Sequence, residues 1–474
     1  ADEGPHVGKS EAISSLEAAM PQKPGRPGRA SGGSGEAARA GACVEAATAG
    51  RGNERSGTHE GQQGLMELAV ERQNCLAALK RVKANKGSPG IDGMTVGELP
   101  AYLKASWLRI REELLAGRYQ PRPVRRVAIP KPGGGERELG IPTVLDRFVQ
   151  QLLLQVLQPR FDPTFSDASY GFRPGRRAHD AVRRAQGYVS GGRRFVVDVD
   201  LEKFFDRVNH DVLMGRLATK IADKRMLGLI RRYLTAGLLA DGVVIERHEG
   251  TPQGGPLSPL LANVLLDEID KELEKRGHAF VRYADDLNVY VRSRAAGERV
   301  MAALRRLFAG LRLRVNEAKS AVARATERQF LGFSFWVAKG RVVKRRIAAK
   351  AMSRMKDRVR QITTRSGGRS LARVCEELGT YLAGWKGYFR IAETPRVLAD
   401  TDKWVRHRLR ALQLKHWKRG RTIYRELVAR GMSANAAARV AANGRRWWRN
   451  SAMAIHIALP NALFDKLGVP RLAT

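Results

Sequence analysis

The chain has 474 residues, 43% of them hydrophobic, which is enough for about three globular domains. Lys and Arg number 85 against 47 Asp and Glu, so the formal net charge is +38. This charge indicates a polyanionic partner, nucleic acid, whether the protein is an enzyme or a basic ribosome-associated factor. No apolar run of about 18 residues and no signal peptide is visible, which argues against a membrane protein and predicts a soluble, intracellular one.

Cysteine and histidine patterns argue against two further classes of protein. The three cysteines, Cys43, Cys75 and Cys375, lie far apart, and the nine histidines show no HExxH or zinc-finger spacing. A disulfide scaffold and a cysteine zinc site are therefore not expected, and neither is a zinc-dependent nuclease module.

The N-terminal region divides into a polar leader and two helices. Residues 1–64 are rich in Gly, Ala, Ser, Glu and Arg, so they cannot offset the entropy of ordering and are predicted to be disordered. Residues 65–84 have apolar positions at helical spacing among Arg and Lys, which predicts one basic amphipathic helix. Turn formers at 85–90 end it, and a second helix is expected to run to about residue 115.

Residues 124–142 read as two short strands joined by a Gly-rich turn. Lys131 and Arg137 near the bend would let this hairpin fold over a nucleotide and grip its phosphates. The alternative is a surface hairpin with exposed charges. The apolar stretch 148–161 then predicts a helix of the core.

A motif of aromatic, glycine and arginine residues follows at Tyr170-Gly171-Phe172-Arg173-Pro174-Gly175-Arg176. This mixture suits stacking on bases and contact with a phosphate backbone. A Gly/Pro loop pinned by two aromatic side chains is an equal alternative.

Residues 195–201 form a β-prone run that is interrupted by Asp198 and Asp200. Residues i and i+2 of a strand face the same side of a sheet, and acids in an apolar strand are costly unless they are paired or bound to metal. A buried structural Asp that accepts backbone hydrogen bonds remains the alternative.

The next predicted elements lie between Asp200 and a second acidic motif. Helices are expected at 212–222 and 224–236, followed by a short hairpin across Asp241-Gly242. In residues 250–263 two glycines flanked by prolines would let the backbone approach a ligand closely, just before a helix at 260–276. An ordinary turn before a helix is the alternative.

Residues 280–291 contain two β-prone runs around Ala284-Asp285-Asp286, which predicts a hairpin with carboxylates at its tip. Carboxylate oxygens are the hard ligands that Mg²⁺ prefers, and a polymerase needs two such ions. An adjacent Asp pair is common, and taken alone the motif favours a solvated turn over a metal site.

The C-terminal third changes from mixed to helical character. A helix at 297–311, a loop at 315–320 and a strand at 330–335 precede three helices rich in Arg and Lys at 346–365, 371–389 and 396–414. A short helix at 435–443 is followed by Arg445-Arg446-Trp447-Trp448. Tryptophans among arginines suit nucleic-acid stacking, or a core anchor with a charged rim.

In this order, the motifs resemble those of the reverse transcriptase/maturase proteins encoded by bacterial group II introns. The resemblance covers nearly everything from about residue 65 onward. It rests on Ile129-Pro130-Lys131, Tyr170-Gly171-Phe172-Arg173-Pro174, the strand that ends at Asp200, residues 250–259, Tyr283-Ala284-Asp285-Asp286 and Phe330-Leu331-Gly332. Each motif is weak alone, whereas the ordered set is specific.

The resemblance implies an α+β fold. It consists of a right-hand polymerase with fingers and a ferredoxin-like palm, then an α-helical thumb/maturase domain and a small basic C-terminal DNA-binding region. The corresponding boundaries are 1–64 for the leader, 65–345 for fingers and palm, 346–415 for the thumb/maturase domain and 416–474 for the DNA-binding region.

The resemblance also assigns roles to single residues. It implies catalytic, metal-holding carboxylates at Asp200, Asp285 and Asp286, with two Mg²⁺ ions as cofactors and Asp198 as a supporting acid. Phe205 matches the aromatic steric gate that excludes a ribonucleotide 2′-hydroxyl. The other expected nucleotide contacts are Lys131, Arg137, Gln253 and Lys319. Nucleic-acid contacts are expected from Arg173, Arg176, Arg445, Arg446, Trp447 and Trp448.

The implied function is RNA-directed DNA synthesis from a DNA primer and deoxynucleoside triphosphates. The protein would also bind its group II intron RNA to assist splicing and copy it during retrotransposition at a target DNA, in the bacterial cytoplasm or at the nucleoid. No Cys/His nuclease domain is visible, so second-strand cleavage is not expected. The rival hypotheses are a splicing factor with a relic polymerase site, a reverse transcriptase of a defence or diversity-generating system, and an RNA-dependent RNA polymerase.

Overall fold

The computed structural model describes residues 64–130, 136–240, 243–245, 249–251, 254–443 and 445–473. Residues 1–63 of the predicted leader and the predicted contacts Lys131 and Gln253 lie outside these residues. The chain divides into two compact units. Unit 1 comprises the residues up to Phe165 and Lys203–Leu265, and unit 2 comprises Ser166–Glu202 and the residues from Leu266 onward. This division cuts across the expected 65–345 domain.

Unit 1 combines helices with a small sheet. Its helices are α2 (Leu65–Ala69), α3 (Arg72–Ala84), α4 (Leu99–Leu115), α5 (Val144–Phe161), η1 (Asp162–Thr164), η2 (Phe204–Asp206), α7 (His210–Ala218) and α8 (Lys224–Thr235). Its strands are β1 (Val124–Pro130), β2 (Glu136–Ile141), β4 (Leu238–Ala240) and β5 (Val243–Ile245), in the order β2-β1-β4-β5. The predicted antiparallel β1–β2 hairpin is confirmed, although its bend lies outside the described residues.

The core helix α5 begins earlier than the apolar stretch predicted. The Thr143 hydroxyl accepts a hydrogen bond from the Asp146 backbone N–H and thereby caps the first turn. The buried Asp146 carboxylate also accepts hydrogen bonds from the Tyr119 and Tyr233 hydroxyls, at 2.9 and 3.2 Å. Capping chemistry before residue 148 therefore sets the start of the helix.

The prediction of one N-terminal helix over residues 65–84 is wrong. The helix breaks between α2 and α3, where Val70 and Glu71 leave the helical path. Both helices contact α5, and Leu65 and Met66 are buried. Tertiary packing against α5 favours two short helices over one continuous helix.

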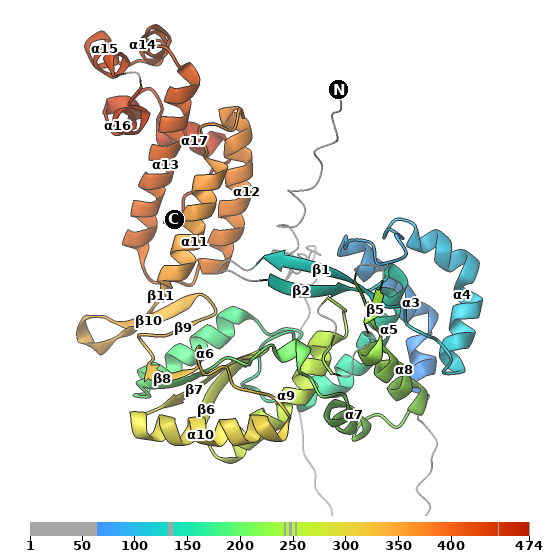
Figure 1. Cartoon of the computed structure of the whole chain (residues 1–474). Helices are drawn as coiled ribbons and strands as arrows, with labels where there is room; N and C mark the ends of the chain where they lie inside the picture. Colours follow the sequence, from blue (N-terminus) through green and yellow to red (C-terminus); the bar gives the residue numbers. More distant parts are fainter. Residues whose placement is uncertain are drawn as a thin grey trace, which may run out of the picture. The chain divides into compact units, whose positions relative to one another are not determined.

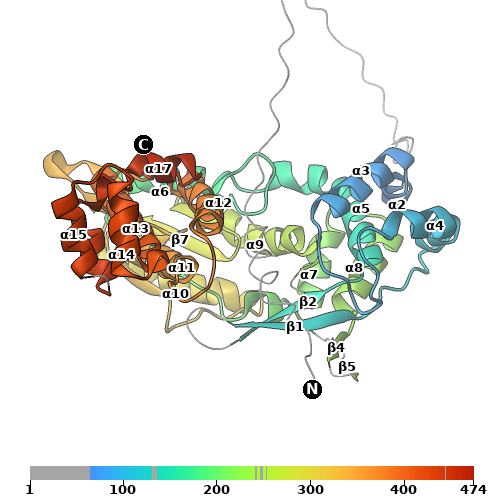
Figure 2. The same cartoon turned by 90° about the horizontal axis from the view of Figure 1, so that it is seen from above.

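Unit 2 is built on an antiparallel sheet in the order β6-β7-β3-β8. Its strands are β3 (Phe195–Val199), β6 (Ala279–Tyr283), β7 (Asp286–Val291) and β8 (Ala321–Arg324). The sheet lies between α6 (Ala178–Ser190) and α10 (Arg294–Gly310), as Figures 1 and 2 show. Val196 clusters with apolar residues of α6, whereas Val197 approaches Gly297 of α10 from the other face. Helix α9 (Ser258–Lys275) contributes residues to both units.

A second sheet in unit 2 corrects the predicted strand at 330–335. β9 (Gln329–Phe330) and β10 (Phe333–Val337) are separate antiparallel strands, and β11 (Val343–Ile347) pairs with β10. Leu331 and Gly332 form the turn between β9 and β10, with φ of 50° and 78°. Left-handed backbone at Gly332 reverses the chain, so Phe330 and Phe333 are both buried in one cluster.

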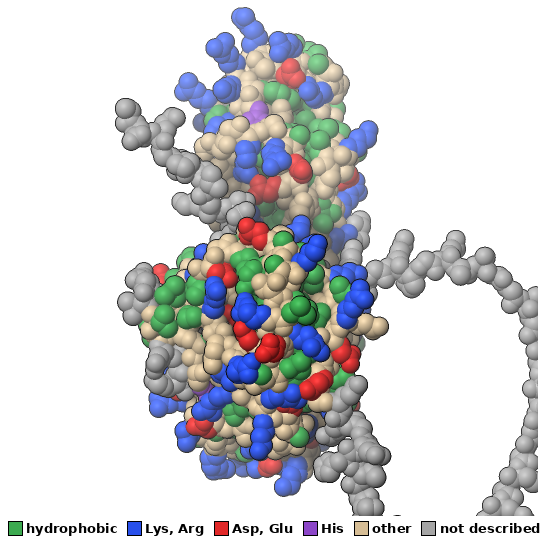
Figure 3. Space-filling model, turned by 90° about the vertical axis from the view of Figure 1, so that its right-hand side faces the viewer, with side chains coloured by type: hydrophobic (Ala, Val, Ile, Leu, Met, Phe, Trp, Pro, Cys, Tyr) green, Lys and Arg blue, Asp and Glu red, His purple; other side chains and the backbone are tan. Residues whose placement is uncertain are grey.

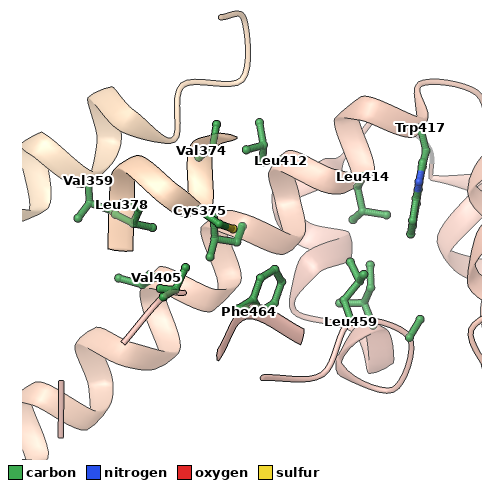
Figure 4. Close-up of a cluster of buried hydrophobic side chains, with 14 of the residues drawn as sticks. Val359, Val374, Cys375, Leu378, Val405, Leu412, Leu414, Trp417, Leu459 and Phe464 are labelled. Carbon is green, nitrogen blue, oxygen red and sulfur yellow. The ribbon is translucent and has the colours of Figure 1, made fainter. Parts of the chain in front are cut away.

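The C-terminal part of unit 2 is helical, and its three long helices confirm the prediction. The elements are η3 (Lys339–Arg341), α11 (Ala349–Ile362), α12 (Leu371–Phe389), α13 (Pro395–Trp417), α14 (Gly420–Val428), α15 (Ala434–Ala442), α16 (Trp447–Ser451), η4 (Ala454–His456) and α17 (Asn461–Lys466). Figure 4 shows Val359, Leu378, Val405 and Phe464 meeting in its core. None of the described helices is both long and apolar enough to span a membrane.

Candidate active site

The predicted acids converge at one end of the central sheet of unit 2. Strands β3 and β7 pair antiparallel, with Val196 opposite Tyr290 and Asp198 opposite Asn288. Side chains alternate between faces, so continuing this register places Asp200 and Asp286 opposite each other on the same face. The structure thus brings together two carboxylates that are far apart in the sequence.

The hairpin that carries the acid pair is confirmed and refined. Tyr283 pairs with Asp286 across a two-residue turn made of Ala284 and Asp285, and Ala284 has a φ of 57°. Asp286 is therefore the first residue of β7 and not part of the turn. Asp285 lies in the turn itself, so the two adjacent carboxylates occupy different backbone environments.

Asp200 is held by the loop that precedes β8. Its backbone N–H donates to the Ser320 hydroxyl at 3.0 Å, and its carbonyl accepts from the Asn316 N–H at 2.8 Å. Lys319 of the same loop places its Nζ 3.0 Å from Asp200 Oδ2, although that buried oxygen accepts no well-aligned hydrogen bond. The loop before β8 therefore fixes Asp200, a predicted catalytic acid. It also carries Lys319, which the resemblance places near the nucleotide.

The charge environment of the carboxylates fits a cation. Part of Asp286 reaches solvent, but desolvation by surrounding protein, with the charges of Asp285, Asp198 and Asp200, raises its pKa to about 7. Neighbouring carboxylates of this kind supply the hard oxygen donors that Mg²⁺ prefers. Within the described part of the chain, no three acidic, His or Cys side chains are arranged as metal ligands.

Asp198 has protein partners at both of its carboxylate oxygens. Arg328 donates to Asp198 Oδ2 at 2.7 Å, and the Asn288 amide nitrogen, in its better-satisfied orientation, lies 2.9 Å from Oδ1. Desolvation raises the pKa of Asp198, and the Arg328 charge opposes that shift. Asp198 is thus held in an ion pair with Arg328, and its role as a supporting acid stays a prediction.

The aromatic and glycine motif at 170–176 supports the turn of the β6–β7 hairpin. The Tyr170 N–H donates to the Arg282 carbonyl at 2.8 Å, and the Arg282 N–H donates to the Ala168 carbonyl at 2.9 Å. Gly171 lies directly against the turn, where a Cβ would stand 2.2 Å from the Ala284 nitrogen. The sequence singled out this motif for nucleic acid and missed its support of the acidic turn.

The two arginines of that motif have different surroundings. Arg173 is buried and its guanidinium donates to the Ser166 and Ser169 carbonyls at 2.6 and 2.9 Å, which stabilises the loop. Arg176 is partly exposed and pairs with Asp167 at 2.5 Å. Contact with nucleic acid therefore stays a prediction for both, and Arg176 is the more accessible.

We expect Gly171→Ala to lower the rate of DNA synthesis by about a hundredfold, because the added methyl group must displace the turn that carries Asp285. Primer extension at saturating substrate measures this effect. Gly187→Ala in α6 is the matched control, since a Cβ at Gly187 meets no atom within 4 Å. Equal rates in the two variants would contradict a positioning role for Gly171.

The predicted steric gate lies in unit 1. The Phe205 carbonyl accepts a hydrogen bond from the Thr251 N–H at 2.7 Å, and a Cβ at Gly250 would lie 3.0 Å from the same carbonyl oxygen. Phe204 is buried and meets the Phe205 ring edge to face at 5.1 Å. The Gly-rich motif thus approaches the gate segment closely. Arg137 belongs to β2, but its side chain lies outside the description.

Two of the predicted C-terminal contacts, Arg445 and Arg446, line a basic hollow in the helical bundle. Arg445 and Arg446 are exposed and, with Lys418 and Arg419, line a hollow of about 600 Å³. Figure 3 shows Lys and Arg side chains projecting from the bundle, at the top of the view. The two tryptophans of this region point to different environments.

Trp447 and Trp448 have different surroundings, and each fits a different one of the two expected roles, core anchor and stacking ring. Trp447 packs against the bundle core, and Arg365 and Lys415 lie 5.8 and 5.3 Å from its ring. Trp448 is 43% exposed and stacks on His407 at 3.8 Å. Trp447 is therefore the core anchor, and Trp448 has the accessible ring.

Comparison with known protein families agrees with this geometry. Residues 129–335 match the family "Reverse transcriptase (RNA-dependent DNA polymerase)", and residues 352–430 match "Group II intron, maturase-specific domain". The chain contains a reverse transcriptase domain and a group II intron maturase-specific domain. This confirms the resemblance, and the first match spans Asp200, Asp285 and Asp286.

Individual relatives match part of the chain. Protein YkfC of Escherichia coli (strain K12) is 39% identical over 45% of this chain and 58% of its own length. Group II intron-encoded protein LtrA of Lactococcus lactis subsp. cremoris is 37% identical over 41% of this chain and 32% of its own length. The chain thus spans about a third to just over half of these relatives. A solved partial Cas6-RT-Cas1–Cas2 complex is 25% identical, covering 52% of this chain and 43% of that one, with a TM-score of 0.35 that carries no argument.

Proposed function

We propose that this chain is an RNA-directed DNA polymerase that also binds its group II intron RNA to assist splicing and copies that RNA during target-primed retrotransposition. The observation that carries the proposal is the pairing of β3 with β7, which directs Asp200 and Asp286 to one face of the sheet beside the Asp285 turn. The reverse transcriptase and maturase-specific matches support both halves of the proposal.

The carboxylates of Asp200, Asp285 and Asp286 would hold two Mg²⁺ ions. When bound, such ions neutralise triphosphate charge and favour ionisation of a primer 3′-hydroxyl. Lys319, with 68% of its side chain exposed, would leave Asp200 and contact the triphosphate instead. Phe205 would exclude the ribose 2′-hydroxyl by its bulk. Asp198 keeps Arg328 in place beside the site.

The domain roles follow from the same proposal. Residues 65–345 would supply the fingers and palm of a right-hand polymerase, with the palm built on the β6-β7-β3-β8 sheet, and residues 346–415, which contain α11–α13, would be its thumb/maturase domain. The basic hollow at residues 418–446 would bind target DNA, because clustered cations favour a phosphate backbone. The protein would act in the bacterial cytoplasm and at the nucleoid when it engages DNA.

Primer extension by the full chain tests the polymerase half. We expect deoxynucleotide addition to a DNA primer on an RNA template in the presence of Mg²⁺ and none after chelation. Ribonucleotide addition in preference to deoxynucleotides would favour an RNA-dependent RNA polymerase, and absence of all synthesis would favour a splicing factor with a relic site.

The basic N-terminal helices are proposed to contact intron RNA. Deleting them would expose the apolar surface of α5, because Leu65, Met66 and Val82 are buried in unit 1. Lys80, Arg81 and Lys83 of α3 are exposed, so their replacement leaves this packing intact. The surface charge can thus be tested without removing the helix.

We expect the triple alanine variant of Lys80, Arg81 and Lys83 to bind intron RNA more weakly, with the slope of log affinity against log salt reduced by about 2 if all three contact phosphates. Filter binding over a salt series measures both quantities. The triple alanine variant of the exposed Arg292, Arg299 and Arg306 removes equal charge elsewhere and should change neither. Identical salt slopes for the two variants would contradict α3 as an RNA contact.

A further inference from the structure

The largest fully buried side chain among the described residues is an arginine next to the acidic turn. Arg282 of β6 has 1% of its side chain exposed, and its partner Asp270 of α9 has none. The guanidinium Nε donates to Asp270 Oδ1 at 2.8 Å, and Nη2 donates to Oδ2 at 2.6 Å. A charge pair this deep requires good geometry to offset its desolvation.

The third nitrogen of this guanidinium reaches the turn itself. Arg282 Nη1 donates to the Ala284 carbonyl at 2.9 Å, the carbonyl of the peptide bond that leads into Asp285. Ala284 has left-handed backbone, with a φ of 57°, which costs energy for a residue with a side chain. A fixed donor at its carbonyl stabilises this conformation over alternatives.

Arg282 lies on the face of the sheet away from the carboxylates. In the β6–β7 register Arg282 is opposite Leu287, whereas Tyr283 is opposite Asp286. Alternation therefore directs Arg282 and Asp286 to opposite faces, so Arg282 cannot act on a substrate held by Asp286. Any effect of Arg282 on the chemistry must pass through the backbone of the turn.

We propose that Asp270 and Arg282 form a positioning clamp. Asp270 fixes the guanidinium of Arg282 through two of its nitrogens, and the third nitrogen donates to the Ala284 carbonyl, so that Asp285 and Asp286 face Asp200. The inference rests on the proposed polymerase function and adds two residues to its site. A lysine at 282 cannot replace the fork, because a single ammonium cannot span the carboxylate and the carbonyl in this planar arrangement. The clamp complements Gly171, which packs against the same turn from a different segment.

A purely structural ion pair is the competing explanation, and an apolar replacement separates the two. Replacing a buried pair with apolar residues of similar volume commonly preserves the fold, whereas removing one partner leaves a buried charge. The double variant Arg282→Met with Asp270→Leu should therefore fold while lacking the donor to Ala284. Arg282→Lys and Asp270→Asn are the conservative single variants.

The experiment uses the full chain and measures the melting temperature, kcat and the Mg²⁺ concentration for half-maximal primer extension, at saturating template, primer and deoxynucleotides. We expect kcat to fall about tenfold or more in the double variant and in Arg282→Lys, with the Mg²⁺ midpoint raised, and template-primer affinity changed less than about twofold. Arg406→Lys is the matched control, because Arg406 forms another buried pair, with Asp402, in the helical bundle. It should leave kcat and the Mg²⁺ midpoint unchanged.

A double variant with wild-type kcat and Mg²⁺ midpoint would overturn the clamp. If that variant failed to fold, Arg282→Lys would be assayed below its melting temperature instead. A wild-type kcat for Arg282→Lys would also overturn the clamp. A fall in kcat as large in Arg406→Lys would also overturn it, since general loosening would then suffice. A wild-type chain without any DNA synthesis would contradict the proposed function itself, and the clamp with it.

Discussion

Asp285→Ala should abolish primer extension, with a fall in rate of about a thousandfold or more, equivalent to about 4 kcal/mol of transition-state stabilisation. The reason is geometric: Asp285 occupies the turn between β6 and β7, beside Asp286 and the Asp200 strand. In the proposed site, removing the Asp285 carboxylate would take away a hard ligand that Asp200 and Asp286 could not replace. Rapid-quench measurement of single-nucleotide addition gives the rate.

The same variant should keep its fold and its affinity for intron RNA, because Asp285 belongs to a turn and removing a negative charge does not weaken attraction for phosphate. Asp180→Asn on α6 is the matched loss of a carboxylate, since Asp180 is a surface residue paired with Arg183. It should synthesise DNA at the wild-type rate. Synthesis retained in Asp285→Ala would sink the assignment of the catalytic site.

Phe205→Ala should raise the efficiency of ribonucleotide relative to deoxynucleotide incorporation by about a hundredfold, because the aromatic ring would no longer collide with the 2′-hydroxyl. The backbone of Phe205 is held by Thr251, so the truncation removes the ring without releasing the segment. The lost edge-to-face contact with Phe204 should cost about 1 kcal/mol of stability. The ratio of kcat/KM for the two sugars measures the discrimination.

Phe205→Tyr is the control for this second prediction, because it keeps the ring at the same position. Its sugar discrimination should stay near the wild-type value. Unchanged discrimination in Phe205→Ala would show that another residue excludes the 2′-hydroxyl. Increased ribonucleotide use in both variants would point to a general loosening of the segment.

Local sequence patterns predicted the elements that carry the acids. The two β-prone apolar runs around Ala284-Asp285-Asp286 predicted the β6–β7 hairpin, and the spacing of Asp198 and Asp200 predicted a shared face. Helical periodicity likewise predicted α12 with its observed bounds, 371–389. These predictions succeed because the spacing of apolar residues within a short segment already indicates whether it forms a helix or a strand and which side is buried.

Predictions went wrong where a distant contact or a backbone reversal overrode the local pattern. The 330–335 run is β-prone throughout, yet left-handed backbone at Leu331 and Gly332 folds it into two strands. The 65–84 run has helical periodicity, yet packing on α5 divides it. Propensity ranks the options for a segment, and tertiary packing selects among them.

By itself, the sequence determined a strongly basic chain with an ordered set of reverse transcriptase motifs, and it predicted three acids that would hold metal. The tertiary structure decided which residues make those acids a site. Asp200 is fixed by Ser320, 120 positions away, and the acidic turn is braced by Gly171 and by the Arg282–Asp270 pair. The physical reason is that residue type and spacing report local periodicity and burial, whereas positioning contacts form only when remote segments pack together.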